Sequence, residues 1–445
     1  MTTDAVDSFI RTRTSNVPGD GWFENAGLGM FIHWDHASQQ GLEISWAMTG
    51  YYPIERFRDR VTIATYQSSA ATFDPESWDA ARVAKLARDA GARYVVFTTR
   101  HHAGYSMFSS QYSGFGVGTS PSGRDVTREL VDALRAEGIR IGFYYSLSDW
   151  HHPDYPALEE DDLPYALERW PLAGQLEHAG TPLADDRHRR PSAESWDRYR
   201  EYLRGQLTEL LTNYGQIDLL WFDGEWERSP EEWDVDGLHD LIRSLQPNVV
   251  INDRLLGHGD YVTPEQGLPR DVPDGPWELC LTIGEVWGSV PGDTMHKTAT
   301  SLITTLTEAR SRGGNLLLNL SPTGDGSLDH RQVDAFEQIA EWMTRHRESV
   351  HNVSPTVGVD FYGPTTAKPG RLYLHLVMRP IEEIIVRGIP VDRIRRVTLL
   401  ADGRELAYST VDDVHDVTAS ATGELRIPAP EPSAALIDVI AIEFE

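Results

Sequence analysis

The sequence predicts an α/β protein with a (β/α)8-like barrel followed by a small C-terminal antiparallel β-sandwich. Short apolar runs alternate with amphipathic helical patterns over most of the chain, which indicates repeated parallel βαβ units. So many units fit a closed barrel better than an open sheet. After about residue 350 the pattern changes to short alternating runs separated by Gly and Pro, which is typical of a sandwich. We therefore expect a catalytic barrel domain over residues 1–350 and a β-sandwich domain over residues 351–445.

The clearest strand runs from Ile217 to Gly224. It is almost continuously apolar and stops abruptly at Asp223. A run that is buried on both faces is typical of an inner strand of a parallel sheet. Because functional groups gather at the carboxyl ends of such strands, Asp223 is a candidate nucleophile or general base, although a lone Asp there more commonly caps the next helix.

The remaining elements follow in order along the chain. Gly and capping residues bound most of the helical patterns. The other strands are expected at residues 29–34, 94–99, 140–146, 249–254, 279–283 and 315–320. Helices are expected at residues 77–90, 125–137, 199–214, 236–245, 294–312 and 329–347. Residues 153–191 lack periodicity and are expected to form a long surface excursion near the active face.

Composition excludes several classes of partner. The chain has 445 residues and a net charge of 40 − 68 = −28, which argues against nucleic acid and anionic membranes as partners. Cys280 is the only cysteine, so no intramolecular disulfide can form. The first residues carry no basic segment followed by an apolar one, so no signal peptide is visible, and no apolar run reaches membrane-spanning length. We expect a soluble cytoplasmic protein; the sequence does not predict its oligomeric state.

Polar and aromatic side chains follow several of the predicted strands. Each has a structural alternative, such as a satisfied core histidine, a helix cap or an arginine paired with a structural Asp. Their joint occurrence at successive strand ends favours a common site. The candidates are His33, Trp34, His101, His102, Tyr145, Trp150, Asp223 and Arg254, with Glu265, Glu278 and Trp287 from the loops.

A metal site is the first alternative for so many histidines. His101 and His102 are neighbours on a strand and should point in different directions, and no HxH or HExxH pattern occurs. No glycine-rich phosphate loop follows a strand, which disfavours nucleotide binding. Neutral His, Tyr, Trp and Arg side chains around a lone Asp suit the hydroxyls and ring of a sugar better. We therefore expect neither a metal nor a cofactor.

Several separated motifs, in the same order, resemble those of the α-L-fucosidases of glycoside hydrolase family 29. The resemblance spans roughly residues 22–350, and the family has a (β/α)8-like domain followed by a β-sandwich. The motifs are Gly29–Trp34, Thr99–Tyr105, Gly142–Ser146 with Asp149–Trp150, Leu220–Gly224, Asn252–Arg254, Thr263–Glu265, Trp277–Glu278, Trp287–Gly288 and Gly313–Asn319.

The resemblance implies a retaining exo-glycosidase that acts on a fucosylated oligosaccharide or another fucoside. Asp223 stands where the family keeps its nucleophile, and Trp287 where it lies against the sugar's methyl face. The acid/base is Glu265 or Glu278; we favour Glu265, because a loop residue can reach the leaving oxygen from outside the pocket. The positions that match the family's contacts to fucose hydroxyls are His33, Trp46, His101, His102, Tyr145 and Arg254.

Four departures from the family pattern surround the expected pocket. Asp35, Ala103 and Ser289 replace the usual Gly, Asp and Tyr, and Glu43–Trp46 stands where the family shows Glu–Trp–Tyr. These changes leave two alternatives open: a retaining glycosidase for a related deoxy-sugar, or a non-catalytic sugar-binding protein on the same scaffold.

Overall fold

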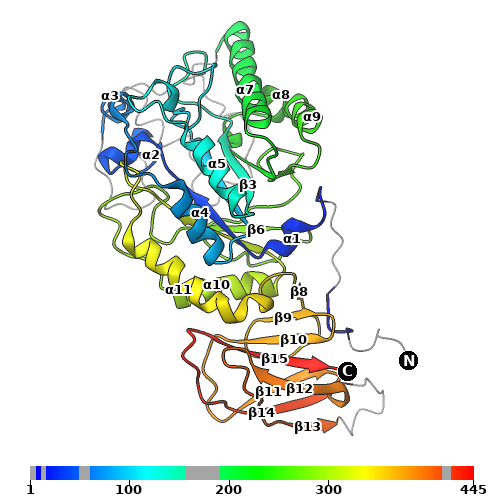
Figure 1. Cartoon of the computed structure of the whole chain (residues 1–445). Coiled ribbons are helices and arrows are strands. Elements are labelled where there is room, and N and C mark those ends of the chain that lie inside the picture. Colours follow the sequence, from blue (N-terminus) through cyan, green and yellow to red (C-terminus); the bar gives the residue numbers. More distant parts are fainter. Residues whose placement is uncertain (1–6, 12–16, 50–60, 156–190, 413–421) are drawn as a thin grey trace.

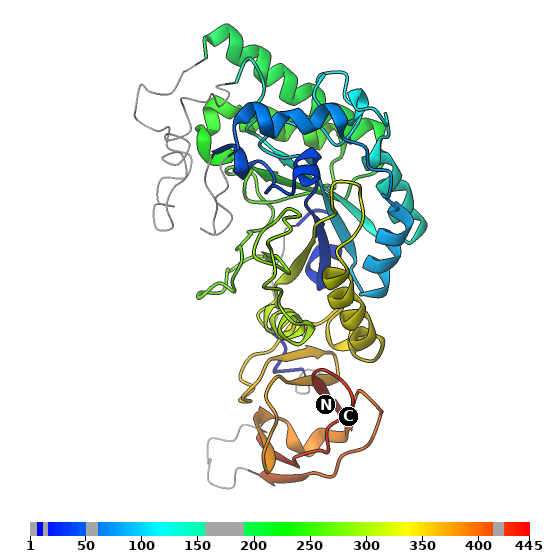
Figure 2. The same ribbon diagram turned by 90° about the vertical axis from the view of Figure 1, so that its left-hand side faces the viewer.

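The computed structural model describes residues 7–11, 17–49, 61–155, 191–412 and 422–445. A larger body with a parallel sheet inside a layer of helices stands above a smaller body made of antiparallel strands (Figures 1 and 2). Most of the predicted excursion at residues 153–191 lies outside the described residues. Within the described part of the chain, no helix is long and apolar enough to cross a membrane.

The larger body is built on seven parallel strands, in the spatial order β5-β4-β3-β2-β1-β7-β6. Six of them are buried along their whole length and one, β3, along all but its first residue, as the continuous apolar runs predict. The strands are β1 (Leu28–Ile32), β2 (Tyr94–Arg100), β3 (Arg140–Ser146), β4 (Leu219–Asp223), β5 (Val250–Ile251), β6 (Glu278–Leu281) and β7 (Asn315–Leu320).

Long helices cover this sheet at the places that the sequence predicts. Their N-caps are Asp79, Asp125, Ser192, Thr298 and Asp329, whose side chains accept a backbone N–H of the first turn, with Asp234 before α9 as the exception. The helices are α4 (Ala80–Asp89), α5 (Val126–Ala136), α7 (Ala193–Asn213), α9 (Val235–Leu245), α10 (Ala299–Ser311) and α11 (His330–His346). Shorter helices are α1 (Trp22–Ala26), α2 (Trp46–Thr49), α3 (Ile63–Ser68) and α8 (Pro230–Trp233).

The regular βα alternation is broken between β5 and β6, where residues 252–277 contain no helix. This stretch, rich in Gly and Pro, instead places an extended segment between the two edge strands. Asp260 N–H donates to Ile251 O of β5 at 2.7 Å, and Gln266 N–H donates to Cys280 O of β6 at 2.9 Å. The segment, residues 260–266, thus bridges both edges of the sheet and carries Glu265 to its rim.

Alternate residues of the strands face the enclosed interior. One inner cluster joins side chains from all seven strands, whereas their sequence neighbours pack in the larger core with the helices. The inner cluster includes Phe31, Tyr94, Val96, Tyr144, Leu219, Trp221, Val250, Cys280 and Leu317. Whether a residue stands at an odd or an even position of its strand, which we call its strand parity, therefore decides whether it can reach a site inside the sheet.

The smaller body has two antiparallel sheets around their own apolar core, as the alternating runs predict. One sheet has the order β12-β15-β10-β9-β8 and the other β11-β14-β13. The strands are β8 (Ser354–Pro355), β9 (Thr365–Lys368), β10 (Arg371–Leu376), β11 (Glu383–Ile389), β12 (Ile394–Leu399), β13 (Ser409–Asp412), β14 (Gly423–Pro428) and β15 (Asp438–Phe444).

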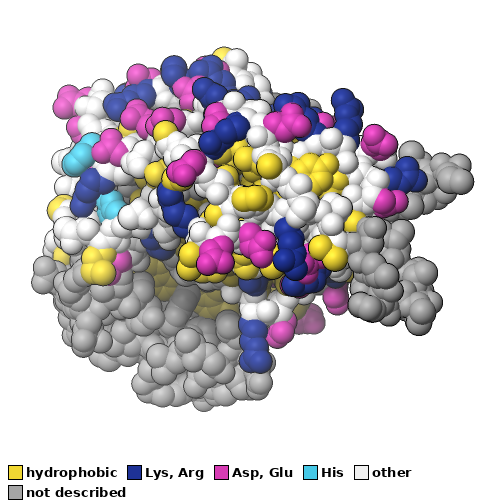
Figure 3. Space-filling model, turned by 90° about the horizontal axis from the view of Figure 1, so that it is seen from below, with side chains coloured by type: hydrophobic (Ala, Val, Ile, Leu, Met, Phe, Trp, Pro, Cys, Tyr) yellow, Lys and Arg dark blue, Asp and Glu magenta, His cyan; other side chains and the backbone are white. Residues whose placement is uncertain are grey.

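The N-terminal residues pack in this second body. Phe9 belongs to its core, with its ring 5.3 Å from that of Phe444, and Ile10 forms a bridge with Thr356. Phe9 and Ile10 therefore pack with the second body, although they precede the predicted domain boundary at residue 350. Viewed from the smaller body, the surface carries acidic and basic side chains side by side (Figure 3).

Candidate active site

The candidate site lies at the carboxyl end of β4. Trp221 and Asp223 share the inward face of this strand, and Asp223 is 7% exposed. β3 pairs with β4 so that Ser146 lies beside Asp223 and Tyr144 beside Trp221. The strand end therefore holds a carboxylate inside the sheet with little contact with water.

Three side chains surround the Asp223 carboxylate. Arg254 Nη1 lies 2.5 Å from Oδ1, and the Tyr144 hydroxyl donates to Oδ2 at 2.7 Å. His102 Nε2 lies 3.5 Å from Oδ2. Burial works to raise the pKa of Asp223, but the charge of Arg254, the nearby His102 and the hydrogen bonds outweigh it, so that the pKa lies below its ordinary value. Asp223 is thus held as the anion that nucleophilic attack requires.

Arg254 connects Asp223 to a second carboxylate. Its Nη2 lies 2.9 Å from Glu265 Oε2, and its guanidinium stacks over the Trp221 ring at 4.4 Å. The Glu265 side chain is 40% exposed, whereas that of Asp223 is 10% exposed. One guanidinium therefore holds a buried and an open carboxylate close together.

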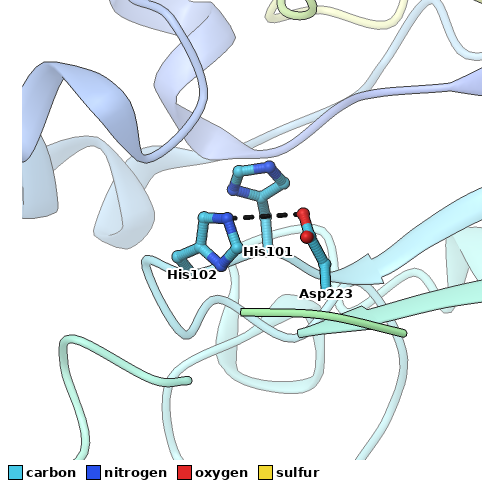
Figure 4. Close-up of side chains that lie close together, drawn as sticks. All are labelled: His101, His102 and Asp223. Atoms are coloured by element: carbon cyan, nitrogen blue, oxygen red, sulfur yellow. Dashed lines mark ion pairs between the residues drawn. The ribbon is translucent and has the colours of Figure 1, made fainter. Parts of the chain in front are cut away.

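Three histidines contribute imidazoles from the ends of β1 and β2. In each ring Nδ1 has a polar partner: Asn319 Oδ1 at 2.8 Å for His33, Ser45 Oγ at 2.6 Å for His101 and Ser146 Oγ at 2.7 Å for His102. Burial lowers the pKa of all three histidines, and that of His33 falls to about 3. Figure 4 shows His101 and His102 beside Asp223.

Tryptophan rings flank these histidines. Trp287 lies 4.7 Å from the ring of His33, and Trp46 and Trp226 lie 5.2 and 5.3 Å from that of His102. Glu43 positions Trp287 by accepting its backbone N–H at 2.9 Å. Apolar ring surface beside hydrogen-bonding imidazoles suits a sugar, which has both kinds of face.

Two of the residues predicted to bind the substrate face away from the site. Trp34 and Tyr145 have the opposite strand parity to His33 and Tyr144, so they face the helices. Trp34 donates to Thr323 O at 2.8 Å, and Tyr145 donates to Gln206 Oε1 at 2.9 Å. Tyr144 takes the place that was predicted for Tyr145. Only the register of β3 against β4, which pairs Tyr144 with Trp221, shows which of the two tyrosines faces inward.

Glu278 lies at the other end of the sheet interior. It begins β6, is fully buried and accepts hydrogen bonds from Tyr94, Trp221 and Tyr261. Burial raises its pKa to about 7, against which these neutral donors act only in part. The structure therefore brings Glu265, and not Glu278, to Asp223. Because the apolar run at residues 279–283 follows Glu278, the rule that functional groups lie at the carboxyl ends of strands could have placed it at the opposite end.

Sequence analysis also missed partners that hold the site residues. Ser45 and Ser146 contact His101 and His102, and Asn319 contacts His33; all three lie in or beside motifs noted above. Glu225 follows Asp223 closely, and burial raises its pKa to about 8. Small polar residues carry no periodic signal, so only the folded contacts reveal these roles.

His101, His102 and Asp223 also have donor atoms within 4.8 Å of one another, and among the described residues they are the one group that close. They could hold a metal ion by distance alone. However, Arg254 and Tyr144 already contact the two oxygens of Asp223, and a metal cation would be repelled by the Arg254 charge. The donor set fits hydroxyl groups better than a cation.

Comparisons with known proteins point to one family. A family model described as alpha-L-fucosidase matches residues 9–348. The tissue alpha-L-fucosidase of Homo sapiens is 27% identical over 433 residues, which cover 89% of this chain and 84% of that protein. Alpha-L-fucosidase isoenzyme 1 from Paenibacillus thiaminolyticus is 32% identical with a TM-score of 0.78, covering 95% of this chain and 98% of that one.

A further solved structure is that of Thermotoga maritima alpha-fucosidase in complex with a mechanism-based inhibitor. It is 25% identical with a TM-score of 0.74, and the match covers 96% of this chain and 97% of that one. The similarity thus includes both bodies of the chain.

Proposed function

The chain belongs to the α-L-fucosidase family and is a glycoside hydrolase, and on that premise we propose that it removes α-L-fucose by a retaining double displacement. Asp223 is the nucleophile and Glu265 is the acid/base. The observation that carries this assignment is the shared guanidinium of Arg254, which holds a buried, ionised carboxylate beside an open one. Retaining enzymes use two carboxyl groups about 5–5.5 Å apart, a spacing that one bridging guanidinium can maintain.

In the first step Asp223 attacks the anomeric carbon while Glu265 gives a proton to the departing oxygen. The bond from the anomeric carbon to the aglycone breaks, and an ester to Asp223 forms. In the second step Glu265 takes a proton from water, the water oxygen bonds to the anomeric carbon and the ester bond to Asp223 breaks, which releases the sugar and restores Asp223. The greater exposure of Glu265 supports its role, because the leaving group and the water must both reach it.

The polar residues of the site stabilise the sugar as its ring flattens. His33, His101 and His102 are neutral and fixed, so they can exchange hydrogen bonds with hydroxyls without reorganising. Trp287 and Trp46 supply ring surface. The mechanism-based inhibitor bound to the Thermotoga maritima relative supports a common reaction.

We extend the proposal to the architecture of the two bodies. The segment 260–266 completes a closed (β/α)8-like barrel between β5 and β6, and the second body is a β-sandwich with a structural role. Trp342 of α11 donates to Ile437 O of the second body at 2.8 Å, which joins the two cores. A soluble, fully active fragment ending near Ser354 would contradict a structural role.

Release of 4-nitrophenol from its α-L-fucoside tests the activity, and proton NMR of the first sugar formed tests the stereochemistry. We expect hydrolysis with the α-anomer appearing first. An initial β-anomer would mean an inverting pair of carboxylates. Binding of fucose without hydrolysis would favour a sugar-binding protein, and preference for another deoxy-sugar would favour the related glycosidase. A panel of fucosylated oligosaccharides that differ in linkage then defines the natural substrate.

A further inference from the structure

His101 and His102 are consecutive, yet the hydrogen bonds behind them have opposite directions. His101 Nδ1 lies 2.6 Å from Ser45 Oγ, and His102 Nδ1 lies 2.7 Å from Ser146 Oγ, with Ser148 Oγ as a longer contact at 3.2 Å. A neutral imidazole donates from one nitrogen and accepts at the other, so the proton on the serine side decides what Nε2 offers to a ligand.

Ser146 can only accept a hydrogen bond from His102. Its Oγ lies 2.8 Å from the carbonyl oxygen of Ser148, and a proton must lie between two oxygens at that distance. A carbonyl has no proton to give, so the single hydroxyl proton of Ser146 is directed there. His102 Nδ1 therefore carries a proton, and its Nε2 is a bare acceptor.

Ser45 donates its hydroxyl proton to His101, whereas Ser146 accepts a proton from His102. The Oγ of Ser45 accepts the backbone N–H of Ala103 at 2.7 Å, and the residue is fully buried. Among the described residues, His101 Nδ1 is the one acceptor within reach of the Ser45 proton. If His101 also donated to Ser45, this buried O–H would have no acceptor among the described residues, and a buried hydroxyl without an acceptor is unfavourable. The satisfied arrangement leaves the proton of His101 on Nε2.

The backbone at Ser45 supports a dedicated role. Its φ of 60° is left-handed, a conformation that is strained for a residue other than glycine. Such strain is commonly found where a side chain must be aimed for function. At Ser45 this conformation brings the hydroxyl to both His101 and the N–H of Ala103.

The ligand side of His102 is open to a substrate group. Among the described residues its buried Nε2 has no hydrogen-bond partner, and it faces Asp223 Oδ2 at 3.5 Å. A ligand hydroxyl placed there has one proton, which a bare Nε2 would accept. His33 has the same polarity as His102: Asn319 Nδ2 donates to Trp287 O, so its Oδ1 must accept from His33 Nδ1.

We propose that Ser45 and Ser146 are positioning residues that fix His101 and His102 in opposite tautomers, giving the site one imidazole donor beside one imidazole acceptor. A ligand hydroxyl against His102 must then donate, and the group against His101 must accept. The hydroxyl between His102 and Asp223 is the one nearest the anomeric carbon, because Asp223 attacks that carbon. This reading of hydroxyl direction rests on the proposed function, whereas the tautomers themselves do not.

The tautomers can be measured in the substrate-free protein. The full chain is labelled with ¹⁵N in the histidine rings, and long-range ¹H–¹⁵N correlation separates protonated from bare ring nitrogens. Spectra of His101→Asn and His102→Asn identify the two rings. We expect Nε2–H for His101 and Nδ1–H for His102 at neutral pH. The same tautomer in both rings, or a cation in either, would overturn the proposal.

Two pairs of variants test the positioning role. Ser146→Ala should convert His102 to a mixture of tautomers and lower kcat/KM by about tenfold, the effect of one lost hydrogen bond to a fixed group. Ser146→Thr keeps a hydroxyl and should restore both the single His102 tautomer and the kcat/KM. Ser148→Ala keeps the carbonyl that accepts from Ser146 but removes a hydroxyl that lies 3.2 Å from His102 Nδ1. His102 should keep its Nδ1–H in this variant, and a change of tautomer in Ser148→Ala but not in Ser146→Ala would assign the positioning role to Ser148 instead.

For His101 the test variant is Ser45→Ala and the control is Ser69→Ala, which removes an equivalent serine from His36 away from the site. Ser45→Ala should mix the His101 tautomers and lower activity, and Ser69→Ala should alter His36 alone. Unchanged tautomers in Ser45→Ala and Ser146→Ala would refute the positioning role. Opposite tautomers in a protein that fails to hydrolyse fucosides would refute the proposed function and leave the assignment intact.

Discussion

Two fully enclosed carboxyl groups share the interior of the parallel sheet and differ in almost every property. Asp223 ends β4 at the open rim, and Glu278 begins β6 at the opposite end. Burial acts on both in the same direction, since it disfavours the charged form. Even so, the pKa of Asp223 lies below its ordinary value and that of Glu278 rises to about 7.

The difference comes from the partners of each carboxyl. Asp223 has a cation, Arg254, at 2.5 Å, whereas Glu278 has only neutral donors from Tyr94, Trp221 and Tyr261. Trp221 lies between the two ends: its Nε1 donates to Glu278 at 3.1 Å, and its ring face lies under Arg254. A buried carboxyl becomes a nucleophile or a structural acceptor according to the charge beside it, not according to its depth.

The largest effect is expected from replacing Asp223, the charged carboxyl of the two. Asp223→Asn should retain the fold and lose turnover by on the order of 10⁴-fold or more, because no glycosyl-enzyme ester can form. Steady-state kinetics with 4-nitrophenyl α-L-fucoside measure the loss. Near-normal activity would remove Asp223 as the nucleophile. In the smaller Asp223→Gly, added azide should occupy the vacated space and give the inverted β-fucosyl azide.

Replacing Glu265 should give an effect that depends on the leaving group. Glu265→Ala should slow a fucosyl-oligosaccharide by about 10²–10⁴-fold, because its leaving oxygen needs a proton. The first step with a nitrophenyl leaving group should be spared, and azide should restore turnover by attacking the intermediate, giving the retained α-fucosyl azide. If Glu278→Ala shows this pattern instead, the roles of the two glutamates must be exchanged.

Removal of the cation should make Asp223 resemble Glu278. In Arg254→Met the pKa of Asp223 should rise, because the Arg254 charge that offsets burial is gone. The acidic limb of the kcat/KM profile should therefore move to higher pH, with activity reduced on the order of 100-fold. Arg254→Lys keeps the charge and should shift the limb less. A limb that does not move would show that Arg254 does not control the ionisation of Asp223.

Part of the fold and of the site could be predicted from the sequence, including one carboxyl of this comparison. Continuous apolar runs predicted the buried parallel strands, and helical periodicity predicted α4, α5, α7, α9, α10 and α11. Asp223 and Arg254 were found as strand-end residues. Trp34 and Tyr145 were assigned to the site although strand parity turns them toward the helices, because the sequence does not reveal which parity faces inward.

Three further features depend on contacts between distant segments. Residues 260–266 form no periodic pattern, and their place between β5 and β6 is set by backbone hydrogen bonds to both strands. Ser45 acts through His101, 56 residues away along the chain, and such a contact leaves no local signal. The same holds for Phe9, which packs on Phe444 in the second body.

The smallest effect on activity, and the sharpest test of the comparison, comes from Glu278→Gln. Its kcat should stay within about twofold of the unsubstituted chain, because the amide reproduces the neutral carboxyl away from the reacting atoms. The effect on stability should depend on pH. The folded pKa of Glu278, about 7, lies above the ordinary value of 4.5, so the folded form keeps a proton that the unfolded form has released.

The stability that Glu278 contributes is therefore full below about pH 4.5 and is lost as the pH rises toward 7, by up to about 3 kcal/mol. Urea unfolding at pH 5, 6, 7 and 8 should show Glu278→Gln gaining on the unsubstituted chain as the pH rises. Asp223→Asn should show the opposite slope at acidic pH, because the lowered pKa of Asp223 contributes stability that is lost as the pH falls. Parallel slopes in the two variants would mean that both carboxyls are in the same state, and the partner charge would then not be what separates them.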